Sequence, residues 1–568
     1  MSAQIIGVVG AGTMGGGIAE TAVARGFDVI LYDVADEILA RAQVRIQASL
    51  ARQVRRKRIT AERAAAALGR LRLTTRLDDL GAAGLIVEAA PEDLALKRDL
   101  FARLDAIALP HTILASNTSS LSISRVAEAT QHPERVVGMH FFNPAPVMPL
   151  VEIIPGQVTA PEVVAEVTAT ARALGKTPVQ ARDTPGFIVN RIARPFYLEA
   201  LELLGRGAAS AEEIDRIMRL AGGFRMGPFE LLDLIGLDVN LAVTRSIYEA
   251  FSEAPRFRPH PIQEQMVQAG LLGRKTGRGF YVYGGEGVPE RRSLPSAAPP
   301  RAGTPRRVAV LGEGALAEGF KAAARAVGWT VTAPPPDEFG DLPFRLDAVV
   351  DFLLGSGGLG LDPLAAVLPP ESVWLTLMLE RSPTRRAEAG PDWISEEPLD
   401  ALGPAPESSR HLGLRRVVGF ATLPPWQDRG LVELLADPLS SPDALSAAEA
   451  LFRDLGKESA RVKGAVGGVF PRIFAMIVNE AAFALGEGVA SAADIDTALQ
   501  LGANYPQGPL ALADEIGSEV LLGIILKLDS REPGGRYAPA PFLRAMEAAG
   551  RTGRVAGRGF HDYQGRRG

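Results

Sequence analysis

The sequence predicts an α/β domain built on a doubly wound parallel sheet, followed by an all-α domain, with this two-domain unit repeated once in tandem. Three observations support that prediction. A glycine-rich turn joins an apolar run to a helical pattern near the N-terminus. Alternating strand and helix patterns give way to helical patterns alone beyond Lys176. The second half of the 568 residues then repeats segments of the first.

Composition excludes several functional classes. The net charge of −5 gives no basic field for nucleic acid. The chain has no Cys and only six His, so we expect neither disulfides nor a metal centre. We see no signal peptide and no apolar run long enough to cross a bilayer. The expectation is a cytoplasmic protein without nucleic acid or membrane partners.

The glycine-rich turn has the spacing G-x-G-x-x-G. It follows the strand-like run Ile5–Val9, precedes a helical pattern, and is followed by a second strand pattern that ends in Asp33. Gly10 permits the tight turn, Gly12 lets a pyrophosphate approach the backbone, and Gly15 lets the helix pack closely. In this context the motif predicts a Rossmann domain. Asp33 has the spacing of an acid that bonds the adenosine ribose, which favours NAD over NADP.

A basic segment follows the second strand. The residues 37–50 read as a helix, and a second helix is expected from Thr60, so the two form a hairpin. Between them lie five cationic residues, Arg52, Arg55, Arg56, Lys57 and Arg58. Such a run is usually a solvated face, and a binding site for an anionic substrate is the competing interpretation.

Polar residues follow the strands that come next. Residues 85–90 and 112–116 read as buried strands, followed by Glu92 and by the run Asn117–Ser120. Ligands of such sheets bind at the carboxyl ends of strands, so these side chains are candidate site residues. His140 and Glu152 lie inside two further apolar runs. Because burying either alone would be costly, we expect them to pair.

Beyond Gly175 and Lys176 the composition predicts helices only. Thr184–Arg191 is expected to open a long helix, and Ser210 caps the next one. The predicted division of the chain is 1–183 for the Rossmann domain, 184–283 for the all-α domain, 284–305 for a linker, 306–465 for a degenerate Rossmann-like domain and 466–568 for a second all-α domain.

The second copy retains the fold pattern and loses the polar site. Gly312 corresponds to Gly10 at an offset of 302 residues, and Gly419 corresponds to Gly138 at an offset of 281. The corresponding changes are Gly15 to Ala317, Asp33 to Pro335, His140 to Ala421 and Asn190 to Pro471, while Glu152 persists as Glu433. After the second strand the offset falls to 263, since Asp351 corresponds to Glu88. The fall from 302 to 263 means that 39 residues, including the basic hairpin, are absent from the second copy. This pattern indicates structural use of the second copy.

With these residues in place, the first half resembles the 3-hydroxyacyl-CoA dehydrogenase family. The resemblance rests on the motifs GAGTMG, EAAPED, SNTSS, HFFNP and DTPGFIVNR and extends from Ile5 to about Tyr283. The second half resembles the degenerate repeat of long bacterial members. The family resemblance implies NAD-dependent oxidation of a (3S)-3-hydroxyacyl-CoA to the 3-oxoacyl-CoA. It also implies all-α domains that pair, here within one chain, with a homo-oligomer still possible.

The resemblance implies roles by position. His140 would be the general base, Glu152 would orient it, and Ser119 and Asn190 would bind the substrate oxygens. Ser49 and Arg56 would lie near the CoA, with Arg56 at a position where the family often has Lys. The expected cofactor residues are Gly10, Gly12, Met14, Gly15, Asp33, Glu92, Lys97, Asn117 and Asn143.

Two other functions remain open from the sequence. A dehydrogenase of a free hydroxy acid or sugar acid would share the glycine motif and the His–Glu pair. A non-catalytic scaffold that binds NAD or acyl-CoA would explain the half-erased site. The acyl chain length is also open, as is a second carboxylate of the kind found in 3-hydroxyadipyl-CoA from aromatic degradation.

Overall fold

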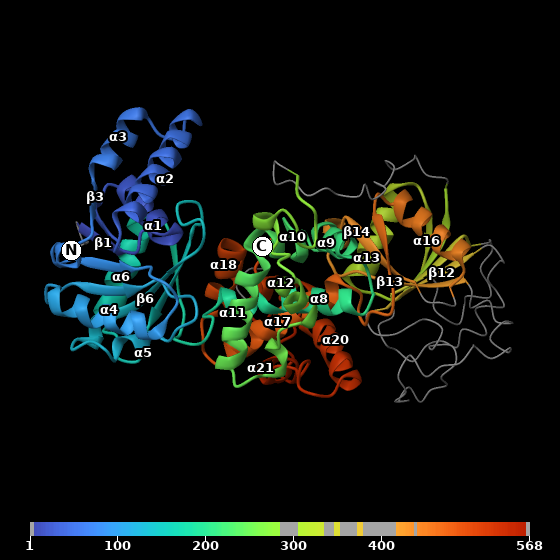
Figure 1. Ribbon diagram of the computed structural model, residues 1–568. Coiled ribbons are helices and arrows are strands. Elements are labelled where there is room, and N and C mark those ends of the chain that lie inside the picture. Colours follow the sequence, from blue (N-terminus) through green and yellow to red (C-terminus); the bar gives the residue numbers. More distant parts are fainter. Residues whose placement is uncertain are drawn as a thin grey trace. The chain divides into compact units, whose positions relative to one another are not determined.

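The structure is a computed structural model that describes residues 5–284, 305–333, 346–352, 372–378, 416–436 and 440–563. The chain divides into two units (Figure 1). The first contains residues 1–193 and 484–508, and the second contains residues 194–483 and 509–568. Residues 285–304 of the predicted linker lie outside the described residues, and so does Pro335.

The first unit is built on an eight-stranded sheet with the strand order β3-β2-β1-β4-β5-β6-β7-β8. The strands from β3 to β6 pair in parallel, β7 runs antiparallel to β6, and β8 runs parallel to β7. This order confirms the doubly wound sheet. The strands are β1 (Ile5–Val9), β2 (Asp28–Tyr32), β3 (Leu71–Thr74), β4 (Leu85–Glu88), β5 (Ile113–Ser116), β6 (Val136–Phe141), β7 (Leu150–Pro155) and β8 (Thr177–Gln180).

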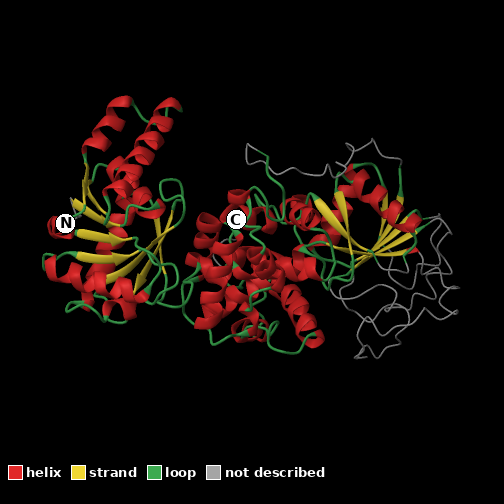
Figure 2. Ribbon diagram, viewed as in Figure 1, coloured by secondary structure: helices red, strands yellow, loops and turns green. Residues whose placement is uncertain are grey.

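Helices flank this sheet (Figure 2). The predicted hairpin is confirmed: α2 and α3 project together from the rest of the unit (Figure 1), and the Thr60 side chain caps α3 by accepting a hydrogen bond from the Arg63 N–H. The helices of the unit are α1 (Thr13–Ala24), α2 (Asp36–Arg55), α3 (Ala61–Gly69), α4 (Leu94–Ile107), α5 (Ile123–Ala127), α6 (Pro161–Ala173), α7 (Val189–Ile192) and α18 (Ala492–Ala503).

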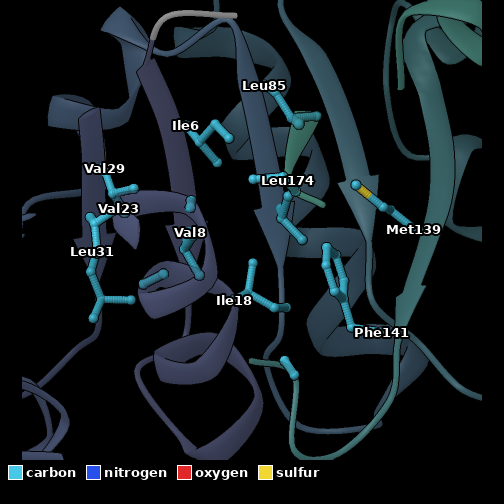
Figure 3. Close-up of a cluster of buried hydrophobic side chains, with 14 of the residues drawn as sticks. Ile6, Val8, Ile18, Val23, Val29, Leu31, Leu85, Met139, Phe141 and Leu174 are labelled. Atoms are coloured by element: carbon cyan, nitrogen blue, oxygen red, sulfur yellow. The ribbon is translucent and has the colours of Figure 1, made fainter. Parts of the chain in front are cut away.

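The core of the first unit lies between the sheet and the helices α1, α2 and α6 (Figure 3). Ile6 and Val8 of β1, Ile18 of α1 and Phe141 of β6 are all at most 2% exposed. Burial of such a side chain stabilises the fold by about 1.5–3 kcal/mol. The glycine-rich turn between β1 and α1 is thereby held by apolar packing on both sides.

Two predictions about the chain after Gly175 are wrong. Residues 177–180 form the edge strand β8, which the sequence pattern hides because the segment is short and contains Pro178. The long helix does not open at Thr184. Residues 184–188 form a turn, with positive φ at Gly186 and Phe187, and the helical segment starts at Val189.

The second unit contains a seven-stranded sheet and most of the α helices of the described residues. Its strand order, β10-β9-β11-β12-β13-β14-β15, repeats that of the first sheet without an equivalent of β3 among the described residues. The strands are β9 (Arg307–Leu311), β10 (Thr330–Thr332), β11 (Ala348–Asp351), β12 (Val373–Leu377), β13 (Val417–Ala421), β14 (Leu431–Leu435) and β15 (Glu458–Val462). Its helices are α8 (Arg194–Gly205), α9 (Ala211–Leu220), α10 (Pro228–Ile235), α11 (Leu237–Ala250), α12 (Pro261–Gln268), α13 (Ala315–Ala326), α16 (Pro442–Asp454), most of α17 (Phe470–Gly486), α19 (Pro509–Ile516), α20 (Ser518–Arg531) and α21 (Pro541–Ala548).

Helices of the two sequence repeats contact each other within the second unit. Arg472 of α17 donates to Glu199 of α8 over 3.0 Å, and both side chains are at most 4% exposed. Arg256 donates to Glu480 over 2.9 Å. Buried charges require such partners. The first repeat and the second therefore share an interior of helices.

Each repeat also contacts the sheet domain of the other. In the first unit, the Arg182 N–H donates to the Val489 carbonyl over 2.8 Å. In the second unit, the Lys463 N–H donates to the Ala208 carbonyl over 2.8 Å. Lys463 corresponds to Arg182, and Val489 corresponds to Ala208, each at the repeat offset of 281 residues. The donor belongs to the first repeat in one bond and to the second repeat in the other. The same contact is thus made twice. In the part of the chain that the structure describes, no helix has the length and apolar character needed to cross a membrane.

Candidate active site

The turn between β1 and α1 has the geometry of a dinucleotide-binding loop. Gly10 has a φ of +91°, and a Cβ at this position would lie 2.8 Å from the Ala89 carbonyl oxygen. A Cβ on Gly15 would lie 1.7 Å from the Gly10 oxygen, so no side chain fits there. A Cβ on Gly12 would meet no atom within 4 Å, which leaves open space above the start of α1. These residues fit the pyrophosphate of NAD.

Asp33, at the end of β2, is joined to the same loop. Its Oδ2 accepts a hydrogen bond from the Ala11 N–H over 2.7 Å, and its Oδ1 accepts one from the Val34 N–H over 2.8 Å. Arg45 of α2, which was not predicted as a site residue, donates to the Ala11 carbonyl over 2.8 Å. Its only sequence signal is a basic residue on the helix that follows the second strand.

His140 and Glu152 are directly opposite each other on the antiparallel strands β6 and β7. Opposite residues of such a pair point to the same face of the sheet, which explains how two residues 12 positions apart meet. The His140 Nδ1 and the Glu152 Oε2 lie 2.6 Å apart, and the two side chains are 4% and 0% exposed. On the other side of the ring, the Ser119 Oγ lies 3.1 Å from Nε2.

The second oxygen of Glu152 anchors the start of α7. Its Oε1 accepts hydrogen bonds from the Ile188 and Val189 N–H groups, each over 3.0 Å. The positive φ of +75° at Gly186 turns the chain so that these two groups face the sheet. Asn190 is the next residue along the chain. The sequence reasoning named Glu152 for its bond to histidine and missed this second role.

The loop that carries Ser119 is held by Glu92. The Glu92 Oε1 accepts from the Thr118 Oγ1 over 2.6 Å and from the Ser119 and Ser120 N–H groups, each over 3.0 Å. Burial alone would raise the pKa of Glu92, but the nearby Lys97 ammonium and these hydrogen bonds together lower it. Glu92 is therefore held as an anion that fixes the position of Ser119.

Behind Glu92 lies a buried ion pair. Lys97 is 1% exposed and donates to the Glu88 Oε1 over 2.6 Å, while the Ser116 Oγ donates to the other Glu88 oxygen over 2.7 Å. Glu88 was not predicted as a site residue, and its sequence signal is an acid at the end of an apolar strand. Lys97 supports the loop from inside the protein, and its contact with the cofactor remains a prediction.

The other predicted cofactor residues lie around the same edge of the sheet. The Asn117 Oδ1 accepts from the Phe141 N–H over 2.8 Å, which ties β5 to β6. Asn143 is exposed just beyond β6, and Met14, at the start of α1, packs against the apolar core. The aromatic rings of Phe142 and Phe187 lie 4.6 and 5.7 Å from the His140 ring.

The two residues expected near CoA lie on α2. The Ser49 Oγ donates to the Glu20 Oε1 over 2.6 Å, and Gln53 donates to the same oxygen over 3.2 Å. Burial raises the pKa of Glu20. Arg56 is exposed at the end of α2.

A cavity of about 700 Å³ lies between the hairpin, α1 and the loop before β7. Its lining includes Glu20 and Gln53 but not Arg56. The cationic residues that line it are Arg25, Arg58, Arg63, Arg70 and Lys176. The sequence analysis singled out the cluster 52–58, and the cavity adds cations from α3, from the end of α1 and from the start of β8.

The second copy has the same framework without the base. Ala421 is opposite Glu433 on β13 and β14, and the two Glu433 oxygens accept from the Val469 N–H over 2.5 Å and the Phe470 N–H over 2.9 Å. Burial raises the pKa of Glu433 to about 7. The described residues contain no cluster of His, Asp and Glu that could hold a metal ion.

Comparison with known proteins identifies the family. Residues 5–184 match the NAD binding domain of 3-hydroxyacyl-CoA dehydrogenase, and residues 186–283 and 467–563 each match its C-terminal domain. The chain is 36% identical over 544 residues to 3-hydroxyadipyl-CoA dehydrogenase of Escherichia coli K12, covering 96% of this chain and 97% of that protein.

A crystal structure described as 3-hydroxybutyryl-CoA dehydrogenase from Escherichia coli K12 superposes with a TM-score of 0.76 at 35% identity, covering 97% of this chain and 99% of that one. A probable 3-hydroxybutyryl-CoA dehydrogenase of Deinococcus radiodurans is 46% identical over 277 residues, which is 49% of this chain and 99% of that protein. The chain therefore belongs to the 3-hydroxyacyl-CoA dehydrogenase family, as an NAD-dependent enzyme whose C-terminal domain occurs twice.

Proposed function

We propose that this chain oxidises a (3S)-3-hydroxyacyl-CoA with His140 as the general base, Glu152 as the residue that orients it, and Ser119 and Asn190 as ligands of the substrate oxygens. The series Glu152–His140–Ser119 carries this proposal, because one nitrogen of a buried imidazole bonds a carboxylate and the other faces a hydroxyl. General bases are recognised by such an arrangement.

The geometry supports a proton path. The Glu152 Oε2 accepts from the Nδ1–H of His140, which leaves Nε2 as the atom that takes the proton of the substrate hydroxyl. The carboxylate then stabilises the imidazolium that forms, since its charge is 2.6 Å away in a buried site. Bound NAD supplies a hydride acceptor. Gly10, Gly12, Gly15 and Asp33 would hold it, and Asn143 would seat its nicotinamide.

An assay of NADH absorbance separates this proposal from its rivals. The full chain is mixed with NAD and, in turn, 3-hydroxybutyryl-CoA, 3-hydroxyadipyl-CoA and a free 3-hydroxy acid. We expect NADH with the CoA esters and little with the free acid. Turnover of the free acid alone would indicate a hydroxy-acid dehydrogenase, and no turnover with any of them would indicate a scaffold. The Escherichia coli relative is named for 3-hydroxyadipyl-CoA, so that ester is the first to test.

We propose that the cavity beside the hairpin binds the phosphates of CoA. Five cationic side chains line it, and Glu20 is the one acidic residue in the lining. The Glu20 carboxylate accepts hydrogen bonds from Ser49 and Gln53. Arg56 precedes Arg58 by two residues and adds charge to the same turn. A dense group of cations around a concave surface attracts phosphate groups, so this arrangement favours a CoA ester over a free acid.

Neutralising Arg58 together with Arg63 is expected to raise KM for a CoA ester by about 1.4- to fivefold per charge, because exposed pairs contribute about 0.2–1 kcal/mol each. KM for the matching pantetheine ester, which lacks the nucleotide, should stay unchanged. Added salt should narrow the gap between the two substrates. Arg56→Gln is compared in the same assay. An equal rise in KM for both esters would indicate that these cations form a solvated face and do not bind the nucleotide.

We also propose one NAD site per chain, with the second copy acting as a built-in partner. In the first copy Gly12 has φ −66° before α1, whereas Gly314 has φ +102° before α13. Ala317 stands where Gly15 admits no side chain. The second loop therefore differs in backbone shape from the loop that fits a pyrophosphate.

Titration calorimetry of the full chain with NADH is expected to give a stoichiometry of one. Gly12→Glu, which places a negative side chain in the open space above α1, should abolish the heat of binding. The control Ala315→Glu, at an exposed position at the start of α13 in the second copy, should leave it unchanged. Two equivalent sites, or loss of binding in the Ala315 variant, would contradict the proposal.

A further inference from the structure

The side chain of Arg191 is 0% exposed, and a residue of the second sequence repeat binds it. Its two terminal nitrogens donate to the two carboxylate oxygens of Glu487, over 2.6 and 3.0 Å. Both residues belong to the first unit. Two parallel bonds of this kind fix the orientation of a guanidinium as well as its position. The second repeat thus reaches into the unit that holds the candidate active site.

Arg191 lies on the short helix α7, next to the groups that the active site uses. Ile188 and Val189 donate their N–H groups to the Glu152 Oε1, and Asn190 follows them. The other Glu152 oxygen bonds His140. A shift of α7 would therefore move Glu152 and Asn190 together, because both depend on the same few residues of backbone.

Glu487 is itself held in place. The Arg182 side chain donates to the Glu487 carbonyl over 3.0 Å, and the Arg182 N–H donates to the Val489 carbonyl over 2.8 Å. Helix α18 follows and packs on α7 and β7. A Cβ on Gly502 would lie 2.6 Å from a Leu150 methyl group and 3.0 Å from a Val189 methyl group. The second repeat therefore presents Glu487 to Arg191 from a backbone that is held by hydrogen bonds and packing.

The other half of the chain gives an internal comparison. The residue that corresponds to Glu487 in the first repeat is Arg206, just beyond α8, which pairs with Glu202 of α8 over 2.7 Å and with Glu532 of the second repeat. Glu433 there binds the start of α17 as Glu152 binds the start of α7, with Ala421 in place of the base. The counterpart of Arg191 is Arg472, which is also bound by an acid of the other repeat, Glu199, over 3.0 Å. Both halves therefore have an ion pair between repeats at this point, but the acid stands at the position of Glu487 only in the half that has His140.

We propose that Glu487 of the degenerate repeat is a positioning residue for catalysis, which acts through Arg191 and α7 on Glu152 and Asn190. The proposal deepens the function proposed above and rests on it for the roles of His140 and Asn190. The second repeat then does more than cover apolar helices: it completes the support of the active site in the other repeat.

The test compares Glu487→Gln, Glu487→Asp and the control Arg206→Gln in the full chain. Glu487→Gln should lower kcat on the order of 10-fold, since small misplacements of catalytic groups have effects of this size or larger. KM for the CoA ester and the Kd of NADH should change little. Glu487→Asp keeps the charge and should recover part of kcat. Arg206→Gln removes an ion pair at the corresponding position and should keep wild-type kcat.

A second measurement does not depend on turnover. The proton between His140 and Glu152 should give a downfield proton NMR resonance, assigned by its loss in His140→Ala. Glu487→Gln should shift or broaden this resonance, and Arg206→Gln should not. An unchanged kcat and an unchanged resonance in Glu487→Gln, with only a lower melting temperature, would reduce the pair to a stabilising contact. An inactive wild-type chain would refute the proposed function instead, while the resonance would still decide the positioning role.

Discussion

Replacing His140 with Ala is expected to lower kcat on the order of 10²–10⁴-fold, the usual contribution of a positioned general base. The hydride cannot leave the substrate carbon unless the hydroxyl proton is being removed, and Nε2 of His140 is the nitrogen that faces Ser119. The Kd of NADH should change little, because the glycine-rich turn and Asp33 lie elsewhere on the sheet edge. Stopped-flow or steady-state NADH absorbance measures the effect.

Glu152→Gln should also lower kcat, since a neutral amide stabilises an imidazolium less than a carboxylate does. The chain supplies a matched control in Glu433→Gln. Glu433 is equally buried and binds the start of α17 in the same way, but Ala421 stands where the base would be. The control should therefore keep wild-type kcat. Near wild-type turnover in His140→Ala would rule out the assignment of the base.

The ratio of kcat/KM for NAD to that for NADP is expected to be on the order of 10² or more, because juxtaposed like charges cost several kcal/mol. Asp33 is half-buried, and its carboxylate already bonds the backbone of the glycine-rich turn. A 2′-phosphate would have to lie beside this fixed anion. Equal kcat/KM values for the two cofactors would refute this interpretation.

Asp33→Asn is the sharper variant, because its amide oxygen can still accept the hydrogen bond from the Ala11 N–H. The loop should keep its shape while the negative charge is lost, so we expect the preference for NAD to fall mainly through a lower KM for NADP. Asp36→Asn, at the exposed start of α2, removes a nearby charge without touching the loop. That control should leave the cofactor preference unchanged.

The features that could be predicted from the sequence are those that depend on residue types at short, fixed spacings. The spacing of glycines with Asp33 identified the dinucleotide loop, because only glycine fits at Gly10 and Gly15. The placement of His140 and Glu152 in apolar runs predicted their pairing, because neither can be buried alone. The repeat offset predicted the second sheet, and the structure has its strands in the corresponding order.

Other features depended on contacts that no local pattern encodes. The edge strand β8 was missed because its four residues are ordered by pairing with β7, and not by their own propensity. Glu88 and Arg45 were missed because each has its role only through a partner on another element, Lys97 and the Ala11 carbonyl. The cationic residues of the cavity come from segments that are far apart along the chain.

By itself, the sequence determined the family, the cofactor class, the candidate base and the replacement of candidate site residues in the second copy, since each of these depends on residue type at a fixed spacing. Only the tertiary structure decided that Glu487, almost 300 positions beyond Arg191, supports the helix next to the active site. An ion pair between distant segments leaves no periodic trace in the chain, because its geometry exists only after both repeats have folded and packed together.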